Sequence, residues 1–112
     1  MSSKTDASRK GYVIFVEEIV DWDLYLNEYL PPAGETLEDH GGTLAVWNED
    51  PDVIEGEWNH NMTVVLEFPS VEDARAWYSD PAYEEVKPIR HEACEYAHAV
   101  ISSAFSPDDL PG

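Results

Sequence analysis

The sequence contains few basic residues. Its 112 residues include 6 lysines and arginines against 24 aspartates and glutamates, which gives a net charge of −18. Three of the cations, Lys4, Arg9 and Lys10, lie in the first ten residues, so the rest of the chain is more acidic still. Affinity for nucleic acid comes largely from lysine and arginine, and anionic membranes repel an acidic surface. We therefore predict a protein that binds neither nucleic acid nor membranes.

Cysteine and long apolar runs are also scarce. The single cysteine, Cys94, excludes an intramolecular disulfide, and the polar start MSSKTDASRK has no apolar segment of the kind found in signal peptides. No apolar run approaches the length that spans a membrane. We expect a cytoplasmic protein.

Several catalytic motifs are missing from the sequence. It has no glycine-rich phosphate loop, no nucleophile elbow and no CxxC pair, so nucleotide hydrolysis, serine hydrolysis and thiol redox chemistry have no support. Cys94 lies between Glu92 and Glu95 and lacks the positive surroundings that activate a thiol. The sequence predicts no cofactor.

The acidic residues are interleaved with 13 aromatic residues and several β-branched runs. Such side chains bury enough apolar area to offset the entropy of ordering the chain, so we predict a folded domain with an acidic surface. An excess of carboxylates suits a cytoplasm of very high salt, where screening removes their mutual repulsion. The composition predicts a halophilic source.

Periodicity and capping residues divide the chain into strands and helices. Asp21, Ser70 and Asp80 are expected N-caps, Pro31-Pro32 should kink or break the first helix, and His40-Gly41-Gly42 should end it. The predicted elements are, in chain order, a strand at Tyr12–Val16, a helix from Asp21 to Leu37, strands at Thr43–Trp47 and Met62–Phe68, a helix from Ser70 to Tyr78, a helix from Asp80 to Ala93 and a strand at Tyr96–Ile101.

The connection from Asn48 to Asn61 is polar and too long for a tight hairpin, with Val53-Ile54 as a possible strand extension or bulge.

The order β-α-β-β-α-β predicts an α+β fold, a ferredoxin-like antiparallel sheet with its helices on one face. We expect one domain over residues 11–101, a disordered tail at residues 1–10 and a flexible acidic tail at residues 102–112. The strands are apolar on both faces, so something must cover the face without helices. A second copy of the chain is the simplest cover, and we predict a homodimer that pairs sheet to sheet.

Several short motifs follow one another in order along the chain: Gly11–Phe15, Tyr25 and Tyr29, His40–Gly42, Glu55–Trp58, Val65–Ser70, Ala74–Tyr78, Pro81–Tyr83 and Pro88–Arg90. Together they resemble the domain-of-unknown-function family numbered 1330, within the dimeric α+β barrel superfamily. The resemblance covers roughly Gly11 to Ile101 and implies a ferredoxin-like homodimer with no settled reaction. The chain departs from the usual pattern in its acidity, in Pro32 and in the Trp58–Asn61 loop.

Two charged residues stand out as candidates for a site. Arg90 could bind a ligand carboxylate or phosphate through its guanidinium fork, although an ion pair with Glu55, Glu67 or a helix carboxylate is the more common role. Glu67 lies in an apolar strand, where burial would raise its pKa towards that of a general base. Glu17 is similar but lies nearer the end of its strand.

The histidines give weaker signals. His60 could act as an acid or base in a loop over the barrel, and His91 is a candidate ligand-binding residue. His91 and Glu95 have the i, i+4 spacing of two metal ligands on one helical face, but two ligands do not make a site, and we predict no metal.

Aromatic side chains could form the walls of a pocket for a flat organic molecule, although core packing explains most of them equally well. The candidate wall residues are Trp47, Trp58, Trp77 and Tyr83.

Three functions remain open at this point. The first is a dimer that binds a small organic molecule between sheet and helices, with Glu67 and Arg90 as polar anchors. The second is a cofactor-independent oxygenase or isomerase in which Glu67 or His60 abstracts a proton. The third is a structural or regulatory dimer without a ligand.

Overall fold

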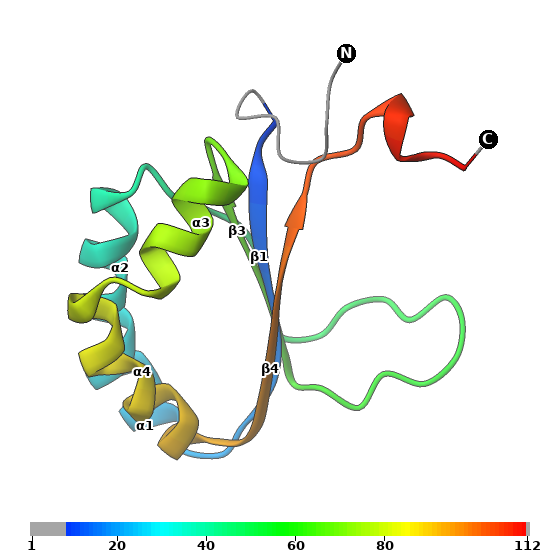
Figure 1. Cartoon of the computed structure of the whole chain (residues 1–112). Helices are drawn as coiled ribbons and strands as arrows, with labels where there is room; N and C mark the ends of the chain where they lie inside the picture. The colour runs from blue at the N-terminus through cyan, green and yellow to red at the C-terminus, as the bar shows by residue number, and fades with distance from the viewer. Residues whose placement is uncertain (1–8, 112) are drawn as a thin grey trace.

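The computed structural model describes residues 9–111. Its centre is a four-stranded antiparallel sheet with the strand order β2-β3-β1-β4, and the helices lie on one face of it (Figure 1). This confirms the predicted α+β class and the ferredoxin-like arrangement. The strands are β1 (Gly11–Ile19), β2 (Thr43–Asn48), β3 (Met62–Phe68) and β4 (Cys94–Ser103).

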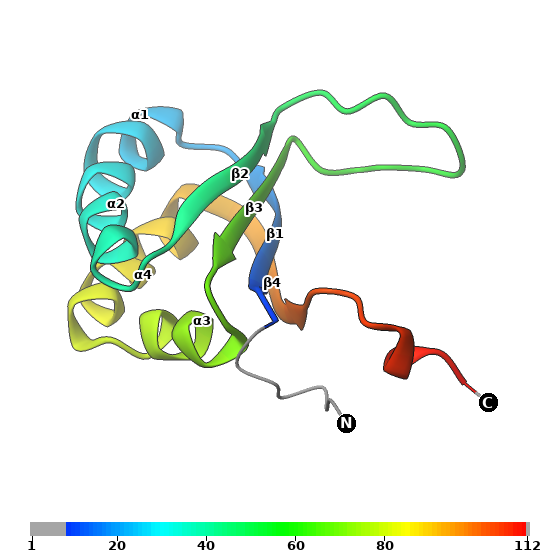
Figure 2. The same ribbon diagram turned by 90° about the horizontal axis from the view of Figure 1, so that it is seen from above.

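The helical layer is built from two segments of the chain, one between β1 and β2 and one between β3 and β4 (Figure 2). None of the helices among residues 9–111 is both long and apolar enough to cross a membrane. The helical elements are α1 (Trp22–Leu24), the π-helical turn η1 (Tyr25–Tyr29), α2 (Leu30–Asp39), α3 (Val71–Tyr78), α4 (Pro81–Ala93) and the C-terminal 3-10 turn η2 (Pro107–Asp109).

Strand β1 alternates strictly between buried and half-buried residues along its nine positions. Because successive side chains in a strand point to opposite faces, Val13, Phe15 and Glu17 lie under the helices while Ile14 and Val16 lie on the face without helices, the open face. The strand extends beyond the predicted end at Val16 to Ile19, and the buried Glu17 within it has side-chain partners in Tyr25 and Arg90.

The prolines of the first helical segment do not break it. Pro31 and Pro32 occupy the first turn of α2, and the π-helical turn η1 immediately precedes them. Proline lacks an N–H and disrupts the regular hydrogen-bond ladder, and a wider π turn is one way for a helix to continue past such a disruption. The predicted kink near Leu30 is therefore a π turn that repositions Tyr25 and Tyr29.

The predicted caps are present. The side chains of Asp21, Ser70 and Asp80 each accept a hydrogen bond from a backbone N–H of the first turn of α1, α3 and α4, respectively. Gly41 has a φ of 73°, the left-handed conformation that glycine permits after the C-terminus of a helix. Pro88 lies inside α4, which continues to Ala93.

The long connection and the termini differ from the expectation. Residues Val53-Ile54 form no strand and are exposed within the loop that joins β2 to β3. Strand β4 extends to Ser103, and a capping box on Ser106 starts η2 inside the segment predicted to be a tail. Residues 1–8 of the predicted N-terminal tail lie outside the described residues, whereas Arg9 is buried and pairs with Asp109 at 3.0 Å.

Candidate functional site

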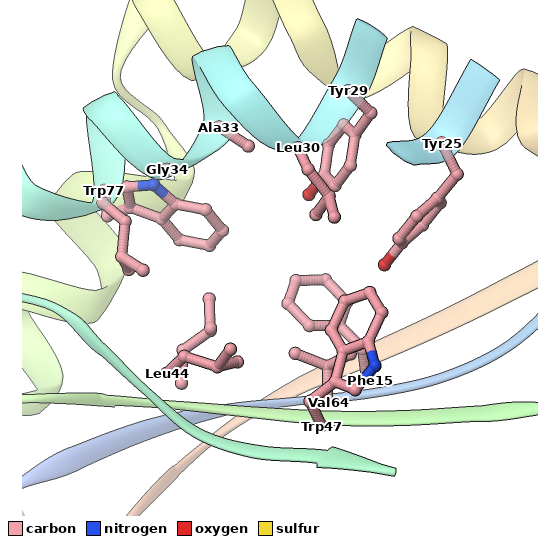
Figure 3. A pocket seen from close by; sticks show the side chains of 12 residues that line it. Phe15, Tyr25, Tyr29, Leu30, Ala33, Gly34, Leu44, Trp47, Val64 and Trp77 are labelled. Atoms are coloured by element: carbon pink, nitrogen blue, oxygen red, sulfur yellow. The ribbon is translucent and has the colours of Figure 1, made fainter. Parts of the chain in front are cut away.

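A pocket of about 400 Å³ lies between the sheet and the segment η1–α2 (Figure 3). Its lining is almost entirely aromatic and aliphatic, and it is open to solvent on one side. This volume falls within the range that is usual for small-molecule sites. The lining residues are Phe15, Tyr25, Tyr29, Leu30, Ala33, Gly34, Leu37, Leu44, Trp47, Val64, Leu66 and Trp77.

Strand β2 supplies the rim of the pocket. Its register against β3 shifts between Leu44 and Val46, which is a β-bulge or similar irregularity. The shift lets both Leu44 and Trp47 lie on the helical side, although an even strand would place residues three apart on opposite faces. The rim is therefore made by two large apolar side chains from a short edge strand.

A buried ion pair lies behind the inner wall. Arg90 of α4 and Glu17 of β1 are 1% and 0% exposed, and Nη1 of Arg90 lies 3.3 Å from Oε2 of Glu17. The guanidinium carbon also lies 4.7 Å from the ring centre of Phe15, whose ring lines the pocket. A charge pair is thus held one side chain away from an apolar cavity.

Three tyrosines complete this network. The hydroxyl of Tyr25 donates to Oε1 of Glu17 at 2.8 Å, and Nε of Arg90 donates to the hydroxyl of Tyr83 at 3.3 Å. The hydroxyls of Tyr83 and Tyr29 are 2.7 Å apart. A continuous chain of hydrogen bonds therefore runs from Tyr25 through the ion pair to Tyr29, and both of its terminal tyrosines line the pocket.

Burial dominates the acid–base behaviour of the network. Desolvation raises the pKa of Glu17, although Tyr25 and Arg90 oppose this effect by favouring the carboxylate. Desolvation also raises the pKa values of Tyr25, Tyr29 and Tyr83, so all three keep their protons at neutral pH. The network consists of one cation, one carboxyl group and three phenols with their protons in place.

Glu67 lies away from this network. It belongs to the set of β3 residues on the open face, where it accepts hydrogen bonds from Lys10 at 2.9 Å and Tyr12 at 3.2 Å. The bond from Lys10 is the main reason that the pKa of Glu67 is lowered. The expectation that Glu67 and Arg90 are the polar anchors of one ligand is therefore wrong, because the two residues lie on opposite faces of the sheet and Arg90 pairs with Glu17.

The loop residues Trp58 and His60 also lie outside the pocket. His60 hydrogen-bonds through Nδ1 to the hydroxyl of Tyr96 at 2.6 Å, and Trp58 packs edge-on against His60. Tyr96 in turn stacks on His98 of β4. This aromatic cluster lies at the base of the β2–β3 loop and shares no residue with the pocket lining.

His91 lies in the last turn of α4 and is exposed. The helix ends at Ala93, so Glu95 belongs to β4 and the expected pair of ligands on one helical face is not formed. Within residues 9–111 no group of three or more potential metal ligands occurs. Burial raises the pKa of the Cys94 thiol to about 12, in keeping with an unreactive cysteine.

Of the four residues predicted to form the walls, two line the pocket, whereas Trp58 and Tyr83 do not. Trp47 and Trp77 line the pocket, and the ring of Tyr83 packs against that of Trp77 with the two ring centres 4.1 Å apart and the planes tilted by 36°. Sequence reasoning overlooked Tyr25 and Tyr29 as site residues, although their i, i+4 spacing on an apolar helical face was visible. The sequence does mark Glu17 as a carboxylate in an apolar strand. Its pairing with Arg90, however, joins residues 73 positions apart, which no local sequence pattern shows.

Comparison with known families identifies the chain. The model of a domain of unknown function, DUF1330, matches residues 10–104, which is most of the sequence. The chain belongs to the DUF1330 family. No curated protein matches it.

Solved structures share the fold of this DUF1330 member. RPA0582, a protein of unknown function from Rhodopseudomonas palustris, has a TM-score of 0.74 and 17% identity over 89% of this chain and 85% of its own. A proposed antibiotic biosynthesis monooxygenase from Caulobacter crescentus has a TM-score of 0.60 and 7% identity over 88% and 92%. A similarly described protein from Nitrosomonas europaea has a TM-score of 0.54 and 10% identity over 89% and 93%. At such identities the similarity establishes the fold alone.

Proposed function

We propose that this DUF1330 protein binds a small, uncharged organic molecule in the pocket between the sheet and η1–α2. The observation that carries the proposal is the pocket itself: about 400 Å³, lined by apolar side chains and open on one side. Filling such a cavity with an apolar ligand removes its walls from water, which is favourable in proportion to the area buried. Trp47 and Trp77 act as walls, while Tyr83 and Arg90 hold the inner wall in place from behind.

Gly34 offers a direct test of pocket binding. It lies on the lining, and a Cβ built on it meets nothing within 4 Å, so a larger side chain there has room to enter the pocket. Gly34→Leu should fill much of the space, whereas Gly34→Ala adds only a methyl group and serves as the matched control. Binding is measured from the fluorescence of N-phenylnaphthylamine, an uncharged probe that the acidic surface does not repel.

The proposal predicts that the wild type and Gly34→Ala bind the probe with similar affinity and that Gly34→Leu loses at least about tenfold. Equal affinity in all three proteins would place the probe elsewhere and contradict the proposal. Failure of the wild type to bind the probe would likewise contradict the proposal.

We further propose that two copies pair through the open faces of their sheets. This face carries half-exposed or exposed apolar residues from all four strands, among them Ile14, Val46, Val65 and Val100. The β2–β3 loop and the C-terminal segment both extend away from the helices, towards the side of this face (Figures 1 and 2). An apolar sheet face of this kind usually marks an interface, and an identical face is the partner always present.

The chain offers a matched pair of variants for this interface. Val100 on the open face and Val20, which follows the end of β1, are 58% and 61% exposed. Val100→Asp should weaken dimerisation by about a hundredfold or more, because it places an unpaired carboxylate from each copy in the interface. Val20→Asp should leave the dimer intact. Sedimentation velocity distinguishes them, and a wild-type monomer at all concentrations would rule the dimer out.

The alternative function is enzymatic, a cofactor-independent oxygenase or isomerase with a carboxylate or histidine base. It is favoured by the fold shared with the two proposed monooxygenases and by Glu17, a carboxylate with a raised pKa next to the pocket. A base of this kind should exchange the α-protons of an acetyl-substituted naphthalene with D₂O. Proton NMR should show exchange faster than the buffer rate in the wild type and not in Glu17→Gln; no catalysed exchange would remove this alternative.

We also infer that the protein works in a cytoplasm of high salt. The support is the net charge of −18, which at low ionic strength leaves the carboxylates of one small domain to repel one another.

A further inference from the structure

We propose that the pocket is built for a carbonyl compound: a flat, uncharged molecule whose carbonyl oxygen accepts a hydrogen bond from Tyr29. This inference rests on the proposed binding function and names the chemical class of its ligand. It follows from an account of the protons in the buried network and from the charges around the pocket.

The two tyrosines that line the pocket differ in what their hydroxyl protons do. Each phenol has one proton to donate. The proton of Tyr25 is committed to Oε1 of Glu17 at 2.8 Å. Tyr29 instead shares a single hydrogen bond with Tyr83 at 2.7 Å, so this pair has two protons for one bond.

Arg90 decides which proton of that pair is left over. Its Nε donates to the hydroxyl oxygen of Tyr83 at 3.3 Å, so that oxygen already accepts a hydrogen bond from a cation. Hydrogen bonds in a chain polarise one another, and a phenol that accepts from a guanidinium becomes the better donor. Tyr83 therefore donates to Tyr29, and the proton of Tyr29 remains available on the pocket side, where its hydroxyl points in Figure 3.

The network as a whole has more donors than acceptors. Nη2 of Arg90 is buried and makes no hydrogen bond within residues 9–111, and the oxygens of Glu17 are both engaged, one by Tyr25 and one by Arg90. Buried polar groups are normally paired, so the group that a ligand must bring to this wall is an acceptor. A carbonyl oxygen supplies an acceptor without bringing another donor.

The charges around the pocket indicate that the ligand is uncharged. The net charge of −18 disfavours an anion, and the guanidinium behind the Phe15 ring disfavours a cation. An ion of either sign would also lose its hydration on entering a cavity with this apolar lining. The rings of Trp47, Trp77 and Phe15 around the cavity suit a flat, ring-sized body.

Two probes of nearly the same shape test the inference. Acetylnaphthalene has a carbonyl oxygen where isopropenylnaphthalene has a methylene group, so the ratio of their affinities isolates the acceptor. Both are measured by displacement of N-phenylnaphthylamine from the wild type and from Tyr29→Phe, Tyr25→Phe and Tyr12→Phe, with circular dichroism to check folding. Tyr12 lies on the open face, where its hydroxyl bonds Glu67, and serves as the control outside the pocket.

The ratio of ketone to alkene affinity should fall about fivefold or more in Tyr29→Phe, the effect of one hydrogen bond. It should hold in Tyr25→Phe, even where both probes bind more weakly, and in Tyr12→Phe. An unchanged ratio in Tyr29→Phe, or a loss of preference in Tyr25→Phe instead, would overturn the inference while leaving pocket binding intact. If N-phenylnaphthylamine binds the wild type but neither probe displaces it, this inference fails while pocket binding stands; if N-phenylnaphthylamine itself does not bind, pocket binding fails.

Discussion

Arg90 and Glu17 are the residues on which the interior depends most. Each is almost completely buried, and each provides the opposite charge that the other needs. Removing one partner of such a pair leaves an unpaired charge in an apolar interior, whereas removing both charges together often changes the free energy of unfolding very little. We therefore expect the loss of one partner to lower the free energy of unfolding by much more than the loss of the whole pair.

We predict that Arg90→Met lowers the free energy of unfolding by about 3–5 kcal/mol. The double variant Glu17→Gln/Arg90→Met should recover most of this loss, because glutamine still accepts from Tyr25 and carries no charge. Urea denaturation followed by circular dichroism measures both. A double variant no more stable than Arg90→Met would show that the arginine contributes through packing alone.

The same variants should differ in their pH dependence. Burial already raises the pKa of Glu17 with Arg90 in place, and loss of the guanidinium should raise it further. An acid whose pKa is raised in the folded state contributes stability below its unfolded pKa of about 4.3, and this contribution is lost as the pH rises through the folded pKa. Compared with the wild type, Arg90→Met should therefore become less stable from about pH 4 upward, and the double variant should not.

At this scale the sequence shows which residues are unusual but not which of them meet. The sequence marks Arg90 as one of few cations, but it predicts the partner of Arg90 to be Glu55, Glu67 or a helix carboxylate rather than Glu17. The parity of β1 and β3 decides the pairing: Glu17 lies on the same face as Phe15, and Glu67 lies on the open face with Val65. Because successive residues of a strand point to opposite faces, assigning a residue to the wrong face of the sheet replaces a buried partner by an exposed one.

At the scale of elements, two glycines show where the backbone is tight and where it is open. A Cβ on Gly11 would lie 2.5 Å from the carbonyl oxygen of Ser70 and 2.6 Å from Cα of Val71, so the start of β1 passes directly against the start of α3. Gly34 in α2 has open space around it. The same substitution should thus have opposite effects at the two positions.

Gly11→Ala is expected to destabilise the fold, because backbone atoms of α3 must move to make room. Gly34→Ala should stabilise it by about 0.5–1 kcal/mol, the usual gain from replacing glycine within a helix. Thermal unfolding of the two variants beside the wild type gives the sign of each change. A neutral Gly11→Ala would mean that β1 and α3 can separate without loss of packing.

Most elements could be predicted because their signals are local. Proline and glycine positions, caps and alternation located β2, β3, α3 and α4 to within one or two residues. The π turn and the register shift at Leu44–Val46 could not be predicted, since each depends on how neighbouring elements pack rather than on a local pattern. These two irregularities place Tyr25, Tyr29 and Trp47 around the pocket, so the site was harder to predict than the fold.

At the scale of the whole molecule, charge sets the conditions under which the fold is stable. The Debye length is about 10 Å at 0.1 M salt and about 3 Å at 1 M, so carboxylate repulsion across this surface is largely screened only at high salt. We predict that the chain loses structure in dilute buffer and regains it as KCl is added, as followed by circular dichroism. A chain equally stable in dilute buffer would contradict the inferred high-salt cytoplasm.

The class of fold was predictable at this scale because the order of elements and the family motifs agree on it. The homodimer is still a prediction from the two-sided strands, and the proposed ligand chemistry depends on the pocket and its buried network together. Among the described residues, none of the lysines and arginines lines the pocket.

The most direct test of the account is a crystal structure of the protein soaked with acetylnaphthalene. The proposed binding mode places the naphthalene ring between Trp47 and Trp77, with the carbonyl oxygen within hydrogen-bond distance of the Tyr29 hydroxyl. A pocket that is closed by its own side chains, or a probe bound only on the open face of the sheet, would contradict it.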